Sequence, residues 1–330
     1  MCANFIALSQ KSLSFDYSCP VRILLTGGSG MLGSAIQSEL LKTTHTLLSP
    51  NSSELNLLDT KSCQHYFSEN KFDLIIHCAA IVGGINANID SPYEFLTSNL
   101  KIDTNLIDAA RSFEIHDLIY IASSCMYPKN SQTAMSEELI GTGPLESTNE
   151  GYALAKLVGT KKVSITAQEL GLTWRTLVLS NLYGPGDHFD QDRSHLVAAI
   201  IKKVAEAKSS DSKVIDMWGD GSARREFTYV KDVADYIAMN LDNLEQLPAL
   251  LNLGSGVDYS VKEYYLEVMK AFDLEAGIKS DISKPTGMQR KLLNVERARS
   301  LGWKPKTSLN EGLKSTIEWY LRQEGIKYEV

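Results

Sequence analysis

The sequence predicts an α/β protein built on a doubly wound parallel sheet, with a smaller α/β lobe toward the carboxyl end. Short apolar runs typical of buried strands alternate with helical patterns from residue 22 to residue 179. A glycine-rich stretch directly follows the first of these runs and leads into a helical pattern. After residue 185 the regular alternation ends, which indicates a second and less regular part of the chain.

The composition of the 330 residues is that of an ordinary globular protein. Apolar residues make up 43% and charged residues 22%, enough to form a sizeable core. The net charge of −7 argues against nucleic acid as a partner, and no apolar run is long enough for a membrane span. Five scattered cysteines form neither a disulfide framework nor a metal-binding pattern, so we expect a cytoplasmic protein without a metal site. Residues 1–20 lack a signal-peptide pattern and are expected to form a loosely ordered extension.

The apolar runs and helical patterns can be placed in order along the chain. Strands are expected at residues 22–26, 45–49, 72–77, 118–121, 174–179, 214–218 and 250–253, the last returning to the first sheet. Helices are expected through residue 41 and at residues 92–113, 194–208, 231–241, 260–272, 295–301 and 309–323. His77 and Cys78 fall in a buried run, where packing is the favoured interpretation. We therefore expect a dinucleotide-binding, Rossmann-like domain at residues 21–185 and about 226–254, and a substrate-binding lobe at residues 186–225 and 255–330.

Three glycines, Gly27, Gly30 and Gly33, lie between the first strand and the first helix. Glycines let the backbone turn tightly and approach a pyrophosphate at the helix N-terminus. Their spacing differs from the commoner Gly-x-Gly-x-x-Gly, but the strand–loop–helix context favours a nucleotide loop. The second strand leads into residues 50–53, where no acidic side chain stands ready for the 2′-hydroxyl of NAD. This absence favours NADP.

Tyr152 and Lys156 are one turn apart on a predicted helix. An ammonium at that distance stabilises the phenolate, so we expect the pKa of Tyr152 to be lowered. Such a phenol can exchange a proton with a substrate oxygen near neutral pH. By itself this spacing is more often typical of a solvated helix face. The long loop before it, residues 127–150, has the length of a functional segment.

Several stretches resemble the extended short-chain dehydrogenases that act on nucleotide sugars, and most closely the GDP-L-fucose synthase family. They are residues 79–85, 123–128, 148–156, 181–187, 194–195, 218–219, 225–227 and 284–291. The resemblance covers about residues 21–323 in collinear order. Its specific elements are Ser123-Ser-Cys125 and Ser194-His195, and the others are shared with sister enzymes.

The resemblance implies an enzyme that epimerises GDP-4-keto-6-deoxy-D-mannose at C3 and C5 and reduces its C4 ketone with NADPH. Ser123 and Tyr152 would bond the ketone, with Tyr152 as proton donor, and Lys156 would bind the nicotinamide ribose. Cys125 and His195 would act as acid and base. The implied cofactor contacts are Gly27, Ser29, Gly30, Met31, Leu32, Gly33, Ser52, Ala79, Ala80, Ser123, Tyr152, Lys156, Asn181, Leu182 and His195.

The resemblance also implies binding partners. The guanosine diphosphate portion would be held by Lys203, Trp218, Arg225 and Lys291. Helices 92–113 and 151–170 resemble those that form a dimer interface in related enzymes, so we expect a homodimer. Two departures bear on binding. Ser29 and Ser52 stand where some members carry arginines, and Lys203 replaces an arginine, so a bidentate phosphate contact becomes a point charge.

Four alternative functions can be compared by the residues that each would require. A 4,6-dehydratase would carry an Asp-Glu pair where this chain has Ser124-Cys125. A simple 4-epimerase would not need Cys125 and His195 together. A 4-reductase without epimerisation stays open, since geometry decides whether those two side chains reach the sugar. A dinucleotide-sensing protein that had lost its chemistry would predict loss of Tyr152 or Lys156, and both are present.

Overall fold

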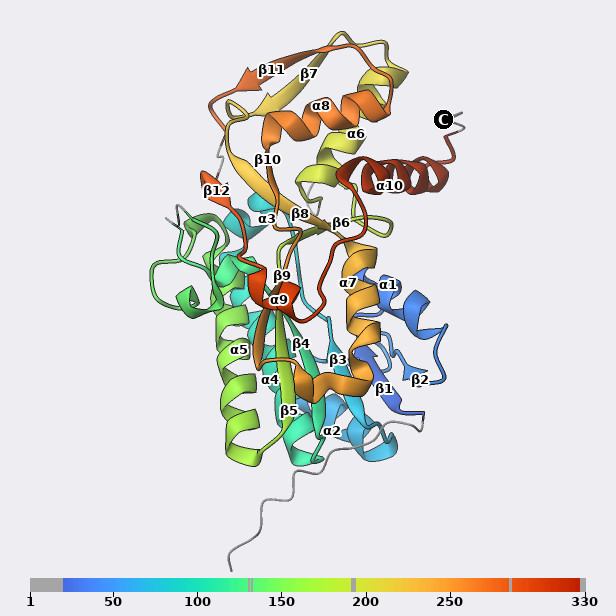
Figure 1. Ribbon diagram of the computed structural model, residues 1–330, viewed down its shortest axis with the longest axis vertical. Helices are drawn as coiled ribbons and strands as arrows, with labels where there is room; N and C mark the ends of the chain where they lie inside the picture. Colours follow the sequence, from blue (N-terminus) through green and yellow to red (C-terminus); the bar gives the residue numbers. More distant parts are fainter. Residues whose placement is uncertain (1–19, 130, 132, 191–193, 285–286, 327–330) are drawn as a thin grey trace, which may run out of the picture.

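A six-stranded parallel sheet forms the centre of the larger part of the molecule (Figure 1). The structure, a computed structural model, describes residues 20–129, 131, 133–190, 194–284 and 287–326. Residues 1–19 of the expected extension lie outside these ranges. The strands occur in the order β2-β1-β3-β4-β5-β9 and every neighbouring pair is parallel. They are β1 (Arg22–Thr26), β2 (Thr46–Leu48), β3 (Leu74–His77), β4 (Asp117–Ser123), β5 (Thr173–Leu179) and β9 (Leu250–Leu253).

Helices cover both faces of this sheet, which confirms the predicted doubly wound, Rossmann-like fold. Figure 1 shows α1 (Met31–Leu40) and α7 (Val230–Met239) packed together on one side. On the other side lie α2 (Thr60–Glu69), α4 (Pro92–Ser112) and α5 (Glu150–Leu170). Because helices cover both faces, the central strands are largely apolar, as is usual for strands buried on both sides.

A smaller group of elements, called the upper lobe here, stands above the sheet in Figure 1. Its centre is β8 (Arg224–Tyr229), which pairs with β6 (Asn181–Tyr183), β10 (Asp258–Ser260) and β12 (Arg290–Lys291). A second, two-stranded sheet pairs β7 (Val214–Trp218) with β11 (Gly277–Asp281). Helices α6 (Leu196–Ser209), α8 (Val261–Ala271) and α10 (Leu309–Gln323) pack around a hydrophobic core of their own.

Short elements complete the connections. They are α3 (Ile85–Asp90), α9 (Glu296–Ser300) and the 3-10 helices η1 (Ser124–Met126), η2 (Glu137–Leu139), η3 (Ser147–Asn149) and η4 (Leu241–Gln246). The sequence did not predict β6, β10 or β12, because strands of two or three residues are too short to show a period. None of the described helices combines the length and the apolar character that crossing a membrane requires.

The carboxyl-terminal segment returns from the upper lobe to the first sheet. Trp303 packs in the core of that sheet and donates its indole N–H to the carbonyl of Gly254 at 2.7 Å. The carboxylate of Asp232, on α7, accepts from the backbone N–H groups of Lys306 and Thr307, both at 3.0 Å. These bonds attach the segment to the end of β9 and to α7.

The close packing of α5 against α4 gives a test of the fold. A Cβ atom at Gly151 would lie 2.4 Å from the carbonyl oxygen of Pro92, so α4 and α5 must separate to admit it. We expect Gly151→Ala to lower the free energy of unfolding by about 1–3 kcal/mol, the usual cost of overpacking. The matched control is Gly277→Ala, where the added carbon meets no atom closer than 3.6 Å. Urea denaturation of both variants measures the difference, and equal stabilities would contradict the packing argument.

Candidate active site

The predicted catalytic side chains of the first sheet gather at its carboxyl edge. Ser123 is the last residue of β4, and Cys125 lies in η1, which follows at once. The backbone N–H of Cys125 donates to the Ser123 hydroxyl at 3.3 Å. Helix α5 packs against η1 and carries Tyr152 and Lys156 in its first two turns. Residues that are distant in the sequence thus come together beyond one strand end, where ligands bind in this class of sheet.

Lys156 is 2% exposed and bonds to a carboxylate that the sequence did not single out. Its ammonium lies 3.3 and 3.5 Å from the two carboxylate oxygens of Asp103, which is 1% exposed on α4. The same carboxylate accepts from the Tyr120 hydroxyl at 2.5 Å. Burial raises the pKa of Asp103, but Lys156 and the hydrogen bonds outweigh burial and hold that pKa below its usual value. Asp103 and Lys156 therefore form a buried ion pair.

The expectation that Lys156 lowers the pKa of Tyr152 is wrong for this structure. Burial raises the pKa of Tyr152 well above its usual value, and the neighbouring Cys125 and Asp103 raise it further. The charge of Lys156 is balanced by Asp103 and so does little for the phenolate. Tyr152 is accordingly a protonated phenol over the physiological pH range.

Cys125 is 4% exposed, and burial raises the pKa of its thiol. Lys291 is the strongest of the groups that oppose this increase, followed by the hydrogen bond with Ser123 and by Lys156. Lys291 lies on β12, directly opposite Arg225 of β8. The upper lobe thus places a cation close enough to favour the thiolate of a cysteine on the lower sheet.

His195 stands at the start of α6, where it is the N-cap residue rather than part of the helix as predicted. Its Nδ1 lies 3.5 Å from a carboxylate oxygen of Asp187, which is 4% exposed. The loop that carries Asp187 reaches the start of α1, because a Cβ atom at Gly186 would lie 3.4 Å from the Cα of Met31. Among the described residues, no hydrogen bond or ion pair joins His195 to Cys125.

Asp187 was missed as a site residue. Its only signal in the sequence is its position in residues 181–187, one of the stretches that carry the family resemblance.

An exposed aromatic ring lies between two cations in the upper lobe. Trp218, at the end of β7, is 37% exposed. The ammonium of Lys203 lies 5.7 Å from the centre of its ring and that of Lys284 lies 5.5 Å away. Lys203 also donates to the carbonyl of Asp216 at 3.0 Å, which fixes its position. A flat ring with adjacent positive charge suits a base that carries phosphates.

The glycine loop has the close contacts that a phosphate-binding turn needs. Gly27 has a φ of +72°, and a Cβ atom there would lie 2.7 Å from the backbone N of Ala79. A Cβ at Gly33 would lie 2.1 Å from the carbonyl oxygen of Gly27. Helix α1, which begins at Met31, has no side-chain cap and no acidic residue in its first turn. Its N-terminal N–H groups thus remain available for an anion.

The other predicted cofactor contacts occupy the same edge of the sheet. Ser29 and Ser52 are exposed on the loops after β1 and β2. Ala79 and Ala80 follow β3, and Leu182 packs against the core of the sheet. Asn181 begins β6 and donates to the carbonyl of Glu226 at 3.3 Å.

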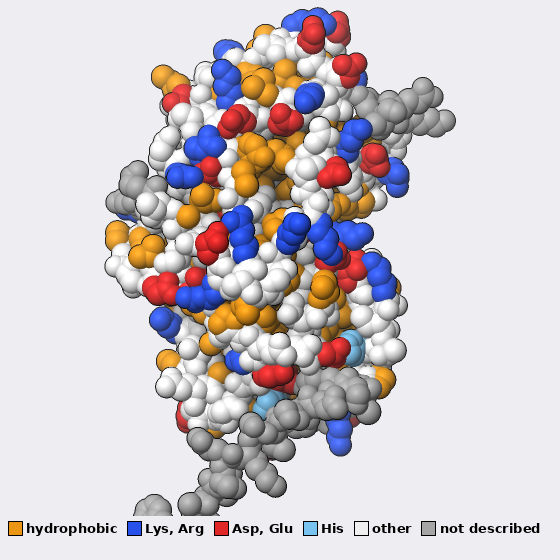
Figure 2. All heavy atoms as spheres, in the orientation of Figure 1, with side chains coloured by type: hydrophobic (Ala, Val, Ile, Leu, Met, Phe, Trp, Pro, Cys, Tyr) orange, Lys and Arg blue, Asp and Glu red, His pale blue; other side chains and the backbone are white. Residues whose placement is uncertain are grey.

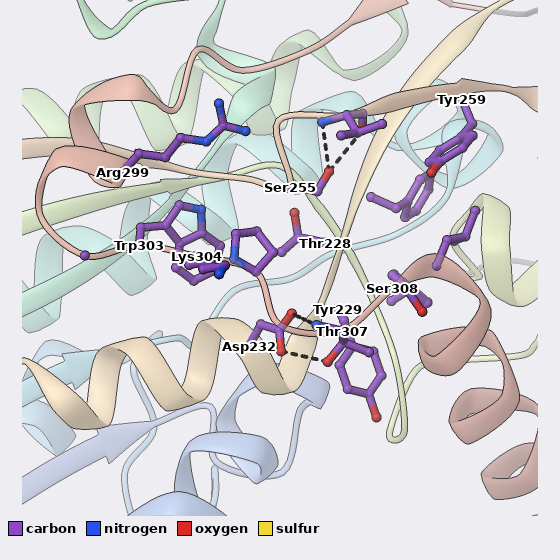
Figure 3. Close-up of a pocket in the computed structure, with 16 residues that line it drawn as sticks. Thr228, Tyr229, Asp232, Ser255, Tyr259, Arg299, Trp303, Lys304, Thr307 and Ser308 are labelled. Atoms are coloured by element: carbon purple, nitrogen blue, oxygen red, sulfur yellow. Dashed lines mark hydrogen bonds between the residues drawn. The ribbon is translucent and has the colours of Figure 1, made fainter.

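A separate cavity of about 690 Å³ lies between β8, the start of α7 and the carboxyl-terminal segment (Figure 3). Figure 3 shows Asp232 already bonded to Thr307 within it. No predicted catalytic residue is among the described residues that line this cavity. It is therefore distinct from the edge that carries Ser123 and Tyr152.

The charged surface side chains and the possible metal ligands can be compared with the expected function. Figure 2 shows acidic and basic side chains interspersed over one face, with several basic ones across its middle. Within the described ranges, no group of three or more His, Cys, Asp or Glu side chains could hold a metal ion.

The electrostatic effect of Lys291 on Cys125 can be tested by thiol reactivity. Because Lys291 lowers the pKa of Cys125, Lys291→Met reduces the thiolate fraction at a given pH. We expect iodoacetamide to alkylate Cys125 about three to ten times more slowly in this variant at pH 8, since each pKa unit changes the thiolate fraction tenfold. Mass spectrometry of the Cys125 peptide measures the rate. Lys279→Met, on exposed β11, is the control, and equal rates in both variants would refute the effect of Lys291 on the thiol.

Comparison with known proteins identifies the family. A family model described as the NAD dependent epimerase/dehydratase family matches residues 23–254. The chain is 40% identical to GDP-L-colitose synthase of Yersinia pseudotuberculosis, over 92% of this chain and 99% of that protein. It is 38% identical to GDP-L-fucose synthase of Azorhizobium caulinodans, over 91% and 96%.

Solved structures agree with the sequence relatives. A GDP-6-OMe-4-keto-L-xylo-heptose reductase from Campylobacter jejuni is 27% identical, with a TM-score of 0.83 over 92% of this chain and 98% of that one. A GDP-mannoheptose C4 reductase from Campylobacter jejuni, solved with NADP bound, is 28% identical with a TM-score of 0.81 over 91% and 98%. The family resemblance of the sequence is thus confirmed, and the chain belongs to the NAD-dependent epimerase/dehydratase family.

Proposed function

We propose that the protein converts GDP-4-keto-6-deoxy-D-mannose to GDP-L-fucose, by epimerisation at C3 and C5 and by NADPH-dependent reduction at C4. The observation that carries this proposal is the grouping of Ser123, Cys125 and Tyr152 beyond the end of β4. Relatives named GDP-L-fucose synthase, at 38% and 35% identity, support the same substrate class.

The chemistry of a 4-ketosugar explains why one site serves two reactions. The C4 ketone acidifies the hydrogens on C3 and C5, so a base can remove one and an acid can return it on the opposite face. Negative charge then develops on the ketone oxygen, where Ser123 and Tyr152 donate hydrogen bonds. Cys125 and His195 act as the acid and base, and a carboxylate oxygen of Asp187 lies 3.5 Å from Nδ1 of His195. Both epimerisations pass through the same carbonyl.

Reduction uses the same oxygen. When held by the glycine loop and the start of α1, NADPH would supply the hydride for C4. Tyr152 donates a proton to the oxygen as the hydride arrives, and its raised pKa keeps that proton in place at neutral pH. Lys156 binds the nicotinamide ribose, with its ammonium held in place by Asp103.

The cofactor of this chain is NADP(H). The glycine loop and the uncapped start of α1 fit a dinucleotide pyrophosphate. At the adenosine end, Ser29 and Ser52 are exposed, and Glu54 accepts from the backbone N–H of Asn51 rather than standing free. An uncharged end of β2 suits a 2′-phosphate better than an acidic one does.

The upper lobe holds the guanosine diphosphate. Trp218 offers a ring for the base, with Lys203 beside it, and Arg225 and Lys291 face each other across β8 and β12 as the phosphate-binding cations. Under this assignment the cofactor binds to the first sheet and the sugar lies between the two parts of the chain.

The protein works as a cytoplasmic homodimer. Apolar side chains remain exposed along the outer face of α5 and at the start of α4, where a second copy would cover them: Tyr93, Leu154, Val158 and Ile165. The cytoplasmic location is proposed from the scattered cysteines of the sequence, which form no disulfide pattern.

A second candidate is the synthesis of GDP-L-colitose, which the relative of that name supports at 40% identity. L-colitose is L-fucose without its 3-hydroxyl, so its precursor needs inversion at C5 only. Incubation of each 4-ketosugar with NADPH, followed by identification of the product, separates the two. Formation of GDP-L-fucose establishes the proposal, and turnover of the 3-deoxy substrate alone replaces it with the second candidate.

The acid–base pair is tested by isotope exchange. In heavy water without NADPH, the wild type is expected to incorporate deuterium at C3 and C5 of the ketosugar. Cys125→Ala and His195→Ala should lose most of this label while still reducing ketosugar that has already been epimerised. Cys63→Ala, another buried cysteine, should exchange normally. Full exchange in both site variants would leave a reductase without this acid–base pair.

The cofactor preference is tested at the end of β2. We expect NADPH to be favoured over NADH modestly, because Ser29 and Ser52 offer hydroxyls rather than charge. Ser52→Arg adds a charge-assisted bond to the 2′-phosphate and should widen the preference about tenfold. Ser280→Arg, on exposed β11, should not. Ratios of kcat/KM for the two cofactors measure it, and a wild type that favours NADH would disprove this assignment.

A further inference from the structure

A network of hydrogen bonds lies behind the Tyr152–Lys156 pair and centres on Asp103. The carboxylate accepts from Lys156, from the Tyr120 hydroxyl and from Nε2 of His77, the last at 3.0 Å. Both Asp103 and His77 are buried, at 1% and 0% exposure. The Asp103 carboxylate is therefore surrounded by donors from β3, β4 and α5, and the proposed chemistry gives a role to Lys156 alone among them.

The direction of these bonds can be assigned. Burial lowers the pKa of His77, so its ring is neutral and has one donor and one acceptor. Because the ionised carboxylate can only accept, Nε2 of His77 donates to it. Nδ1 then accepts from the Thr26 hydroxyl at 2.7 Å, and that hydroxyl accepts from the backbone N–H of Ala79 at 3.4 Å. A directed chain thus runs from the cofactor edge of the sheet to Asp103.

Among the described residues, Asp103 and Lys156 are the charges at the centre of this buried region, and Lys291 on β12 acts on Cys125 from the upper lobe. The titratable groups that face Asp103, Lys156 and Tyr152 are His77 on β3, Cys78 after it, Tyr120 on β4 and Cys125 in η1. Burial holds His77 in its neutral form and raises the pKa values of Cys78, Tyr120 and Cys125. The remaining charges, those of Asp103 and Lys156, cancel.

Helix α5 packs closely against the side chains of Asp103 and Tyr120. A Cβ atom at Gly159, one turn beyond Lys156, would lie 2.3 Å from the Tyr120 hydroxyl and 2.9 Å from a carboxylate oxygen of Asp103. The ammonium of Lys156 also lies 4.7 Å from the centre of the Tyr120 ring. Helix α5 thus packs directly on this hydrogen-bond network, and Tyr120 and Asp103 fix the position of the Lys156 ammonium.

We propose that Asp103 is a positioning residue: its carboxylate is the counter-ion that fixes the ammonium of Lys156 and so keeps the phenol of Tyr152 protonated. Without Asp103, the unbalanced cation of Lys156 would stabilise the phenolate, and Tyr152 would release its proton more readily. A deprotonated Tyr152 has no proton to donate in reduction. The inference rests on the proposed role of Tyr152 as proton donor in reduction.

The experiment is the pH dependence of kcat for reduction with NADPH, from about pH 6 to about pH 11, and a decline within this range that appears in Asp103→Asn but not in the wild type also counts as the expected shift. In Asp103→Asn, the alkaline decline in kcat should begin at least about one pH unit lower than in the wild type, a tenfold loss of proton affinity. Asp103→Glu keeps the charge and should restore the wild-type position of the decline. Asp117→Asn, which removes another buried carboxylate from β4, is the control and should leave it unchanged.

The outcomes separate this inference from the proposed function. If Asp103→Asn lowers kcat but its alkaline decline coincides with that of the wild type, Asp103 is merely structural and the inference fails. Near-normal reduction by Tyr152→Phe would instead defeat the proposed function. If circular dichroism shows that Asp103→Asn is unfolded, Asp103→Ser, which leaves room for water, is used in its place. The alkaline decline in kcat of Asp103→Ser must then show the same shift.

Discussion

The buried ion pair between Lys156 and Asp103 is the constraint that organises this site. Two charges removed from water are costly unless their geometry is fixed and their other bonding positions are filled. Tyr120 and His77 fill those positions from β4 and β3, so the ion pair joins two strands to two helices. Because α5 carries both Lys156 and Tyr152, its position against the sheet is set by the same bonds. The buried residues Asp103, Tyr120 and His77 therefore influence the charges of the site as much as the residues that would contact the substrate.

The sequence predicted the fold well wherever the signal was local. The runs at residues 214–218, 250–253 and 309–323 coincide with β7, β9 and α10 in full, because each is a single uninterrupted pattern. The turn at Gly27 to Gly33 was recognisable because strand, loop and helix follow one another directly. Two-residue β12 has no such pattern, and its pairing depends on β8, which lies more than sixty residues earlier.

The electrostatics of the site could not be predicted in the same way. The spacing of Tyr152 and Lys156 shows that they share a helix face, but it does not show which third group takes the charge of the lysine. That group, Asp103, lies 53 residues away in the middle of α4, where a lone polar residue looks like an ordinary helix position. Asp187 was hidden for a similar reason, since it approaches His195 through a loop rather than along a helix.

The return of the carboxyl-terminal segment has a consequence for synthesis on the ribosome. The core of the first sheet includes Leu293, Val295 and Trp303, and its edge strand β9 begins only at Leu250. About nine-tenths of the chain must therefore leave the exit tunnel before this core can close. Until then the apolar strands β1 to β5 are incompletely covered, and chaperones that bind exposed hydrophobic surface have their longest opportunity on this nascent chain.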